Sequence, residues 1–286
     1  MTSRSLLAIA AMLLFAACSS GAGASPPPTV VPATMPRTDQ RVSPEPSVAP
    51  AALTIFGAAS LKGALEEAKS AYEAANPGTT ITLATDSSAA LETQIEQGAP
   101  ADVFLSADTT NPKKLVDAGF AAREPVNFAG NGLTIIVPKG NPGGLSAPED
   151  LAKAGLKVIA AGDEVPITKY ATQLIANLAG QAGAPAGFEA AYAANVASKE
   201  DNVKAVVGKI ELGEGDAAIV YVTDANASDV VEPVELPDAA NVPATYAGVV
   251  VEASPNQAAA GAFLDWLASA EGQKILATFG FLPPPS

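Results

Sequence analysis

Four groups of small, hydroxylic or amide residues stand where predicted helices begin, and such positions can bind a small anion without any charged side chain. They are residues 57–60, 86–88, 165–168 and 201–202. The first N–H groups of a helix have no intrahelical partner, and the helix dipole adds partial positive charge at the same end. The same residue types are also ordinary helix caps, so one group alone indicates only a helix start.

Tyr221 ends a predicted apolar strand and would lie at the same edge as the helix starts. In α/β sheets the helices begin at the carboxyl ends of the strands, and ligands bind there. A tyrosine at a strand end is also common as half-buried packing. Taken together, the helix starts and the phenol predict a pocket for a small anion.

Alternating strands and helices must position these residues. The sequence predicts strands at 53–56, 80–84, 102–106, 133–137, 157–160, 217–222 and 247–251, and helices at 61–76, 89–97, 168–180 and 202–212. Residues 255–279 carry apolar side chains at helical spacing. This alternation predicts α/β lobes with largely parallel sheets, and 286 residues suffice for two lobes.

Charge and composition exclude several functions. The chain has 16 basic and 30 acidic residues and a net charge of -14, which argues against nucleic-acid binding and means that an anion must be attracted by short-range dipoles. There is no histidine, so a Ser-His-Asp site is impossible. A Ser-Lys or carboxylate pair stays open, but no spacing singles one out. We therefore expect neither an enzyme nor a cofactor.

The N-terminus predicts export. Arg4 is followed by an apolar run at 6–15 that is too short to span a bilayer, and then by Ala16, Ala17 and Cys18. Residues 1–18 resemble a bacterial lipoprotein signal, which implies that Cys18 is lipidated; a plain secretory signal is the alternative. Residues 19–51 are rich in Pro, Ala, Ser and Gly, which indicates an extended tether or a cleaved spacer.

Several stretches follow the motifs of one known receptor family in order and spacing: 56–61 (Phe-Gly-Ala-Ala-Ser-Leu), 94–104, 106–108, 165–166 with 170–171, 218–221 with 223–225, and 279–281. Through these stretches the sequence from residue 53 to residue 282 resembles the molybdate-binding receptors of ABC importers. The resemblance implies a two-lobed α/β type II periplasmic binding protein (venus flytrap) fold, with a mainly parallel sheet flanked by helices in each lobe. Lobe 1 would be discontinuous, at 52–131 and 240–286, and lobe 2 would be 132–239.

The resemblance also implies where the ligand binds. Molybdate or tungstate would sit between the lobes as an oxyanion, held by hydroxyls and backbone N–H groups without direct metal coordination. The family's contacts fall on Ser60, Ser87, Ser88, Ile167, Val203 and Tyr221. The implied partners are ABC permease and ATPase subunits, the receptor would be a monomer, and the membrane would be reached only through the lipid anchor.

One departure from the family pattern affects the site. The family usually has a small residue before the serine pair, where this chain has Asp86, and two alanines separate Ser88 from Leu91. Which serine faces the ligand therefore stays open. We expect Asp86 to point away from the ligand and to cap the following helix. A receptor of the same fold for sulfate or phosphate, and a surface lipoprotein without a small ligand, are the alternatives.

Overall fold

The strands of residues 49–285, which the computed structural model describes, form two five-stranded sheets. The predicted signal peptide 1–18, with Cys18, and the predicted tether up to residue 48 lie outside the described residues. The first sheet contains β1 (Ala52–Ala58), β2 (Thr80–Asp86), β3 (Val103–Ser106), β4 (Val126–Asn131) and β10 (Ala244–Val250), in the order β2-β1-β3-β10-β4. The second contains β5 (Leu133–Pro138), β6 (Val158–Ala161), β7 (Val196–Glu200), β8 (Ala217–Tyr221) and β9 (Val231–Val234), in the order β7-β6-β8-β5-β9.

One strand of each sheet runs against the others. In the first sheet β10 is antiparallel to both β3 and β4, and in the second β5 is antiparallel to both β8 and β9. The prediction of mainly parallel sheets therefore holds for strand direction, but each sheet has two antiparallel pairings. β5 and β10 are the first strands that the chain enters after each crossing from one sheet to the other. Each enters its sheet at the edge where the parallel strands have their carboxyl ends, so it must run in the opposite direction.

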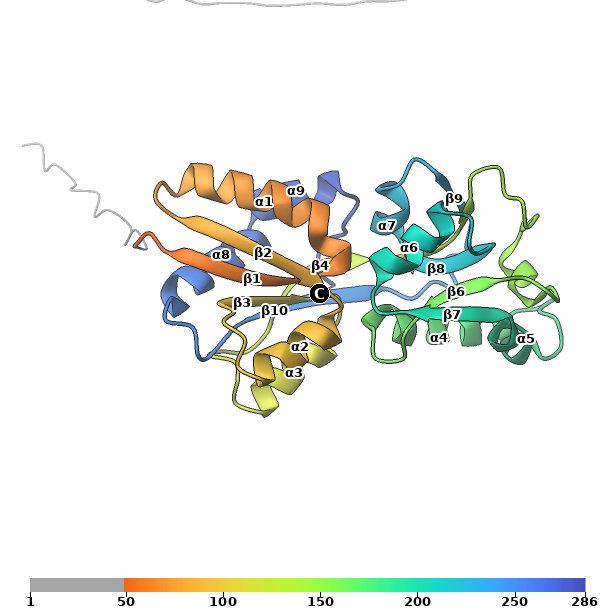
Figure 1. The fold of residues 1–286 in the computed structure, drawn as a ribbon, viewed down its shortest axis with the longest axis horizontal. Coiled ribbons are helices and arrows are strands. Elements are labelled where there is room, and N and C mark those ends of the chain that lie inside the picture. The colour runs from red at the N-terminus through yellow and green to blue at the C-terminus, as the bar shows by residue number, and fades with distance from the viewer. Residues whose placement is uncertain (1–48, 286) are drawn as a thin grey trace, which may run out of the picture. The chain divides into compact units, whose positions relative to one another are not determined.

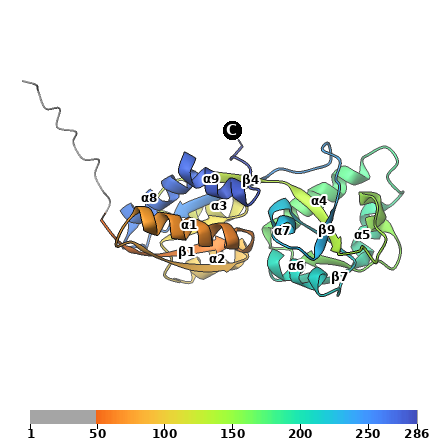
Figure 2. The ribbon, with the colours of Figure 1, turned by 90° about the horizontal axis from the view of Figure 1, so that it is seen from above.

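Helices cover both faces of each sheet (Figures 1 and 2). Helices α1 (Lys62–Ala75), α8 (Gln257–Ala268) and α9 (Ala270–Thr278) lie on one face of the first sheet, and α2 (Ser88–Glu96) and α3 (Thr110–Asp117) lie on the other. On the second sheet α6 (Val203–Glu211) and α7 (Val222–Asn226) lie opposite α4 (Pro166–Ala179) and α5 (Phe188–Asn195). Phe56, Phe104 and Val249 of the first sheet form one apolar cluster with α2 and α3. Among the described helices none is long and apolar enough to cross a membrane.

The C-terminal helical segment differs from the sequence expectation. Residues 255–279 form two helices, α8 and α9, that separate at Ser269, whose backbone is extended at φ -74° and ψ 174°. Gly272 makes the sharp turn possible, because a Cβ there would lie 2.3 Å from the carbonyl oxygen of Leu267. Apolar spacing continues across the break and hides it from the sequence pattern.

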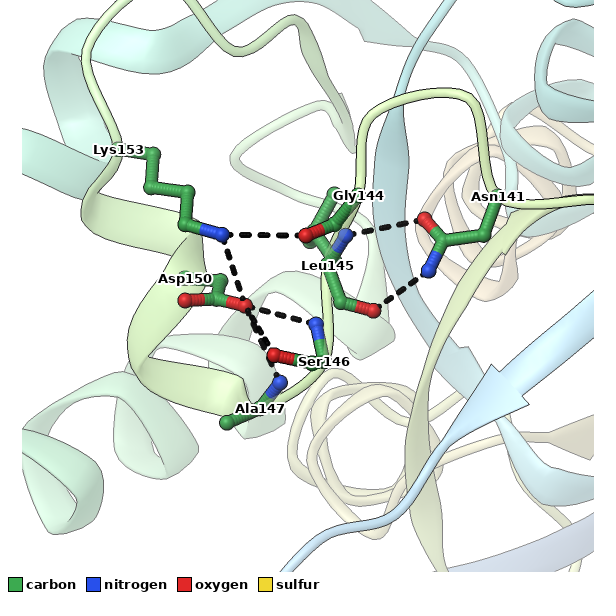
Figure 3. Close-up of polar contacts among 7 residues, drawn as sticks. All are labelled: Asn141, Gly144, Leu145, Ser146, Ala147, Asp150 and Lys153. Carbon is green, nitrogen blue, oxygen red and sulfur yellow. Dashed lines mark hydrogen bonds and ion pairs between the residues drawn. The ribbon is translucent and has the colours of Figure 1, made fainter.

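A polar loop follows β5 and precedes the short 3-10 helix η2 (Pro148–Ala152) (Figure 3). The Asp150 carboxylate accepts hydrogen bonds from the backbone N–H groups of Ser146 and Ala147 at 2.7 and 3.2 Å, and Lys153 lies 3.1 Å away. Asn141 bonds the backbone N–H and carbonyl of Leu145. Burial alone would raise the pKa of Asp150, but the donors around the carboxylate outweigh it and lower the pKa.

Asp150→Ala should lower the free energy of unfolding by about 1–2 kcal/mol at neutral pH, because it removes the acceptor for the start of η2. A carboxylate whose pKa is lower in the folded than in the unfolded state stabilises the folded protein at any pH above the unfolded pKa. This stabilisation is lost as the pH falls through the folded pKa. The deficit of the variant should therefore shrink between neutral pH and about pH 3. Urea unfolding of both proteins at several pH values measures this. A deficit that is independent of pH would contradict the assignment.

Candidate functional site

Residues from both sheets line one small, partly open cavity. Its lining consists of short segments at the ends of strands and the starts of helices: Ala58, Ala59, Ser60, Ser87, Ser88, Ala107, Val165, Pro166, Ile167, Val203 and Tyr221. All six residues that the sequence singled out for ligand contact are in this lining, and all six are buried. The fold thus brings them together, although they span more than half of the chain.

The first sheet supplies the serines. Ser60 lies in the 3-10 helix η1 (Ala59–Leu61) that leads from β1 into α1, and its Oγ lies 2.9 Å from the Tyr246 hydroxyl. Ser87 is the N-cap of α2, and its Oγ accepts the backbone N–H of Ala90. Ser88 begins α2, and its Oγ accepts the backbone N–H of Ala107 at 3.0 Å. Because Ser87 and Ser88 use only an acceptor position in these bonds, each keeps its hydroxyl proton for a ligand.

The second sheet supplies helix starts and a phenol. Pro166 is the first residue of α4 and has no N–H, so Ile167 carries the first backbone donor of that helix. Val203 is the first residue of α6, directly after the N-cap Asn202. Tyr221 ends β8 with only 1% of its surface exposed. The chemistry on this side of the cavity is again that of neutral hydrogen-bond donors.

The hydroxyl of Tyr221 has no hydrogen-bond partner among the described residues. A buried polar group without a partner costs free energy, and most buried hydroxyls in proteins are paired. Burial raises the pKa of Tyr221 well above its ordinary value, so the phenol keeps its proton at neutral pH. A permanently protonated hydroxyl that lines a cavity without a partner is suited to donate to a bound acceptor.

The N-termini of helices provide an electrostatic field that favours an anion in the cavity. Among the described residues no charged side chain lines it. Helices α2, α4 and α6, of 9, 14 and 9 residues, all begin there. Three helix N-termini at the lining of one cavity favour a negative ligand at short range, even in a protein whose net charge is -14. The arrangement suits a small anion whose oxygens only accept hydrogen bonds.

Asp86 lies outside this cavity and lines the wider cleft beside it. Its Oδ1 accepts the backbone N–H of Ser87 at 2.7 Å and Nδ2 of Asn202 at 3.1 Å. The expectation that Asp86 caps α2 is wrong: Asp86 is still paired in the β-ladder with Ala58, and Ser87 takes the N-cap position. Asp86 instead links the serine side of the cavity to the start of α6, and no local sequence pattern predicts this contact between the sheets.

A buried carboxylate belongs to α7, the helix that directly follows Tyr221. Asp224 is fully buried in α7, and Lys204 of α6 places its Nζ 3.0 Å from Oδ1. No hydrogen bond of good geometry reaches either carboxylate oxygen from the described residues. Burial raises the pKa of Asp224, and Lys204 and the backbone of Tyr221 offset part of that rise. The ion pair joins α6, which begins at Val203, to α7, which follows Tyr221 directly.

Comparisons with known proteins show which family the chain belongs to. The sequence profile of the family described as bacterial extracellular solute-binding protein matches residues 53–282. The molybdate-binding protein ModA of Mycobacterium tuberculosis strain H37Rv is 35% identical over 233 residues, which cover 81% of this chain and 85% of that protein. ModA of Escherichia coli strain K12 is 29% identical over 246 residues, which cover 80% of this chain and 88% of that protein.

Among solved structures, the sulfate-binding protein SubI of M. tuberculosis H37Rv superposes with a TM-score of 0.72 at 22% identity, covering 81% of this chain and 86% of that chain. At that identity the likeness concerns the fold alone. The two sheets with their flanking helices are the two-lobed α/β fold of periplasmic binding proteins. With a family profile that spans nearly the whole described chain and a relative at 35% identity, the chain belongs to the family of bacterial extracellular solute-binding proteins.

Proposed function

We propose that this protein is the extracytoplasmic receptor of an ABC importer and that it binds molybdate or tungstate in the cavity between its sheets. The observation that carries the proposal is a small, partly open cavity whose polar groups are uncharged donors: three serine hydroxyls, the Tyr221 hydroxyl, which has no partner among the described residues, and the starts of three helices. The ModA relatives support the choice of ligand. The six lining residues Ser60, Ser87, Ser88, Ile167, Val203 and Tyr221 are the proposed ligand contacts.

The donor set also explains which anions the site should reject. Near neutral pH molybdate, tungstate and sulfate are dianions without protons, whereas hydrogen phosphate keeps one proton that needs an acceptor. An unmatched buried polar group costs about 1–3 kcal/mol. Sulfate has the right charge but is smaller than molybdate, so donors placed for molybdate reach it poorly. The same donor set offers no nucleophile with a general base, and we propose a binding protein that is not an enzyme and needs no cofactor.

A panel of oxyanions read by thermal unfolding tests this function. A ligand at 1,000 times its dissociation constant should add about 4 kcal/mol to the free energy of unfolding. We expect this from molybdate and tungstate at micromolar concentrations, and no response to sulfate or phosphate at millimolar concentrations. Stabilisation by sulfate or phosphate alone would assign the receptor to that anion. The absence of any response would favour a surface protein without a small ligand.

The two sheets are the proposed moving parts. We assign residues 52–131 and 240–286 to lobe 1 and residues 132–239 to lobe 2, with the crossings at Gly132 and between β9 and β10. Because the proposed contacts are divided between the lobes, a ligand that binds both halves favours the arrangement in which they meet. That arrangement of a monomeric receptor is the form that a permease with its ATPase would recognise.

Asn202 offers a test of the link between the lobes. Asn202→Ser keeps an acceptor for the N–H of Ala205, so the cap of α6 persists, but it removes the donor to Asp86. We expect molybdate to bind about 3- to 10-fold more weakly, mainly through faster dissociation. Asp86→Asn is the matched control, since its amide oxygen can still accept from Asn202 without the charge. Equal affinities for Asn202→Ser and the unaltered protein would contradict the link.

The lipid anchor is proposed from the leader sequence alone. Cys18→Ala removes the only thiol of the chain, and with it the acceptor for a lipid. The variant expressed in a bacterial host should move from the membrane fraction to the soluble extracytoplasmic fraction, while its molybdate affinity stays the same. Fractionation followed by mass spectrometry of the mature N-terminus measures both the location and the modification. An unaltered protein that is found without lipid would instead point to a plain secretory signal.

A further inference from the structure

Three buried side chains form a hydrogen-bonded series that ends at Ser60. Asn131, the last residue of β4, directs Nδ2 to the hydroxyl of Tyr246 at 3.3 Å. That hydroxyl lies 2.9 Å from Ser60 Oγ, which lines the cavity. Asn131 is 1% exposed, Tyr246 0% and Ser60 6%, so water is not an alternative partner for most of their polar atoms.

The direction of the series follows from the amide of Asn131. Its Oδ1 accepts the backbone N–H of Gly132 at 3.0 Å, which fixes the orientation of the amide and leaves Nδ2 on the other side. The two hydrogens of Nδ2 are used by Thr223 Oγ1 at 2.8 Å and by Tyr246. The Tyr246 oxygen is therefore an acceptor in this contact, and its own proton is left for Ser60.

The remaining proton determines what Ser60 can do. Burial raises the pKa of Tyr246 well above its ordinary value, so the phenol retains its proton at neutral pH. When the Tyr246 hydroxyl donates a hydrogen bond to Ser60 Oγ, the Ser60 hydroxyl cannot at the same time donate to the Tyr246 oxygen. Because Ser60 lines the cavity, its hydroxyl proton is available there.

We propose that Asn131 and Tyr246 are positioning residues that hold the Ser60 hydroxyl as a donor toward the bound anion and so select a fully deprotonated dianion over hydrogen phosphate. The proposal rests on the proposed function and names residues that contribute to its specificity from behind the cavity. Neither Asn131 nor Tyr246 lines the cavity, so both act through Ser60.

The two neighbouring tyrosines have different roles in this account. The rings of Tyr221 and Tyr246 pack edge to face with centroids 5.6 Å apart. Tyr221 lines the cavity with a hydroxyl that has no partner in the described part of the chain, whereas the Tyr246 oxygen is hydrogen-bonded to both Asn131 and Ser60. Loss of the Tyr221 hydroxyl should weaken all oxyanions together. Loss of the Tyr246 hydroxyl should reduce the preference for molybdate over phosphate.

Tyr246→Phe tests the proposal through a ratio of affinities. Without the phenol, the Ser60 hydroxyl can turn and accept the proton of hydrogen phosphate. We expect the ratio of molybdate affinity to inorganic phosphate affinity to fall about tenfold, measured by titration calorimetry with phosphate as competitor. Tyr72→Phe is the matched control, because Tyr72 packs against Phe263 and Trp266 and takes no part in the cavity. It should leave the ratio unchanged.

Asn131→Asp should reverse the series. Its carboxylate keeps an acceptor for Gly132 but accepts from Tyr246, which then accepts the Ser60 proton, so that Ser60 presents lone pairs to the ligand. The added charge opposes both dianions alike and cancels in the ratio, which should fall further than in Tyr246→Phe. If the unaltered protein binds molybdate and both variants keep its ratio, the proposal is wrong.

A readout that needs no ligand separates this proposal from the proposed function. Neutron diffraction from the deuterated protein should place the Tyr246 deuteron on the line to Ser60 Oγ. A deuteron on Ser60 that points to Tyr246 would overturn the proposal, whatever the protein binds. If the deuteron lies as expected but the unaltered protein ignores molybdate, the proposed ligand is wrong, and with it the role in selecting a dianion.

Discussion

Tyr221→Phe should weaken molybdate binding by about one to two decades without destabilising the ligand-free protein. A hydrogen bond to a charged group contributes about 1.5–3 kcal/mol, and each 1.4 kcal/mol is a factor of ten in affinity. Without a ligand the buried hydroxyl has no partner among the described residues, so its removal takes away an unsatisfied polar group. The free energy of unfolding should stay the same or rise by up to about 1 kcal/mol.

Titration calorimetry and urea unfolding of the same variant measure the two effects, with Tyr72→Phe as the control. Ser60→Ala should show a similar loss of affinity. Because burial raises the pKa of Tyr221, its contribution should not vary across the neutral pH range. Unchanged affinity in both Tyr221→Phe and Ser60→Ala would mean that the ligand binds elsewhere. A clear loss of stability in Tyr221→Phe would mean that the hydroxyl has a partner in the free protein.

Lys204→Met should lower the free energy of unfolding by about 3 kcal/mol at neutral pH. The change leaves Asp224 buried without its cation, and removal of one partner from a buried ion pair typically costs about 3–5 kcal/mol. We expect the lower end because the Lys204 side chain is 35% exposed. Molybdate affinity should also fall, since the pair joins the two helices that begin at Val203 and directly after Tyr221.

The pH dependence identifies the cause of that loss. Burial raises the folded-state pKa of Asp224, and the rise should be larger without Lys204. Below the unfolded pKa of about 4 the Asp224 carboxyl is neutral in the folded and unfolded states of both proteins, so the deficit is smallest there. The deficit grows as the pH rises from the folded-state pKa of the unaltered protein to the higher folded-state pKa of the variant. Lys204→Met combined with Asp224→Leu should recover most of the stability, because no buried charge remains. A deficit that is equal at acid and neutral pH, with no recovery in the double variant, would contradict this explanation.

The sequence contained enough information for the principal strands and for the lining of the cavity. Apolar runs such as Leu133–Pro138 are buried on both faces, and the starts of α2 and α6 carry the capping residues Ser87 and Asn202. Some strands carry no such signal: β7 has the sequence VASKE, and β9 contains Pro233 and lies at the edge of its sheet, where proline is tolerated.

The polar contacts behind the cavity could not be predicted in the same way. Tyr246 stands in an apolar strand and reads as packing, yet its partner Ser60 is 186 residues away. Asp86 and Asn202 are 116 residues apart and look like two independent caps. Such pairs depend on how the two sheets meet, which local patterns do not encode. The departure at Asp86 was visible in the sequence, but its role required the position of α6.

A crystal of the protein grown with molybdate, with anomalous data collected at the molybdenum absorption edge, would locate the ligand itself. We expect one strong molybdenum peak in the cavity, with oxyanion oxygens within hydrogen-bonding distance of the Ser60 and Tyr221 hydroxyls and the N–H groups of Ile167 and Val203. We expect no peak near Asp86. Molybdenum bound only elsewhere, or a cavity that stays without it at saturating molybdate, would show that these residues do not form the binding site.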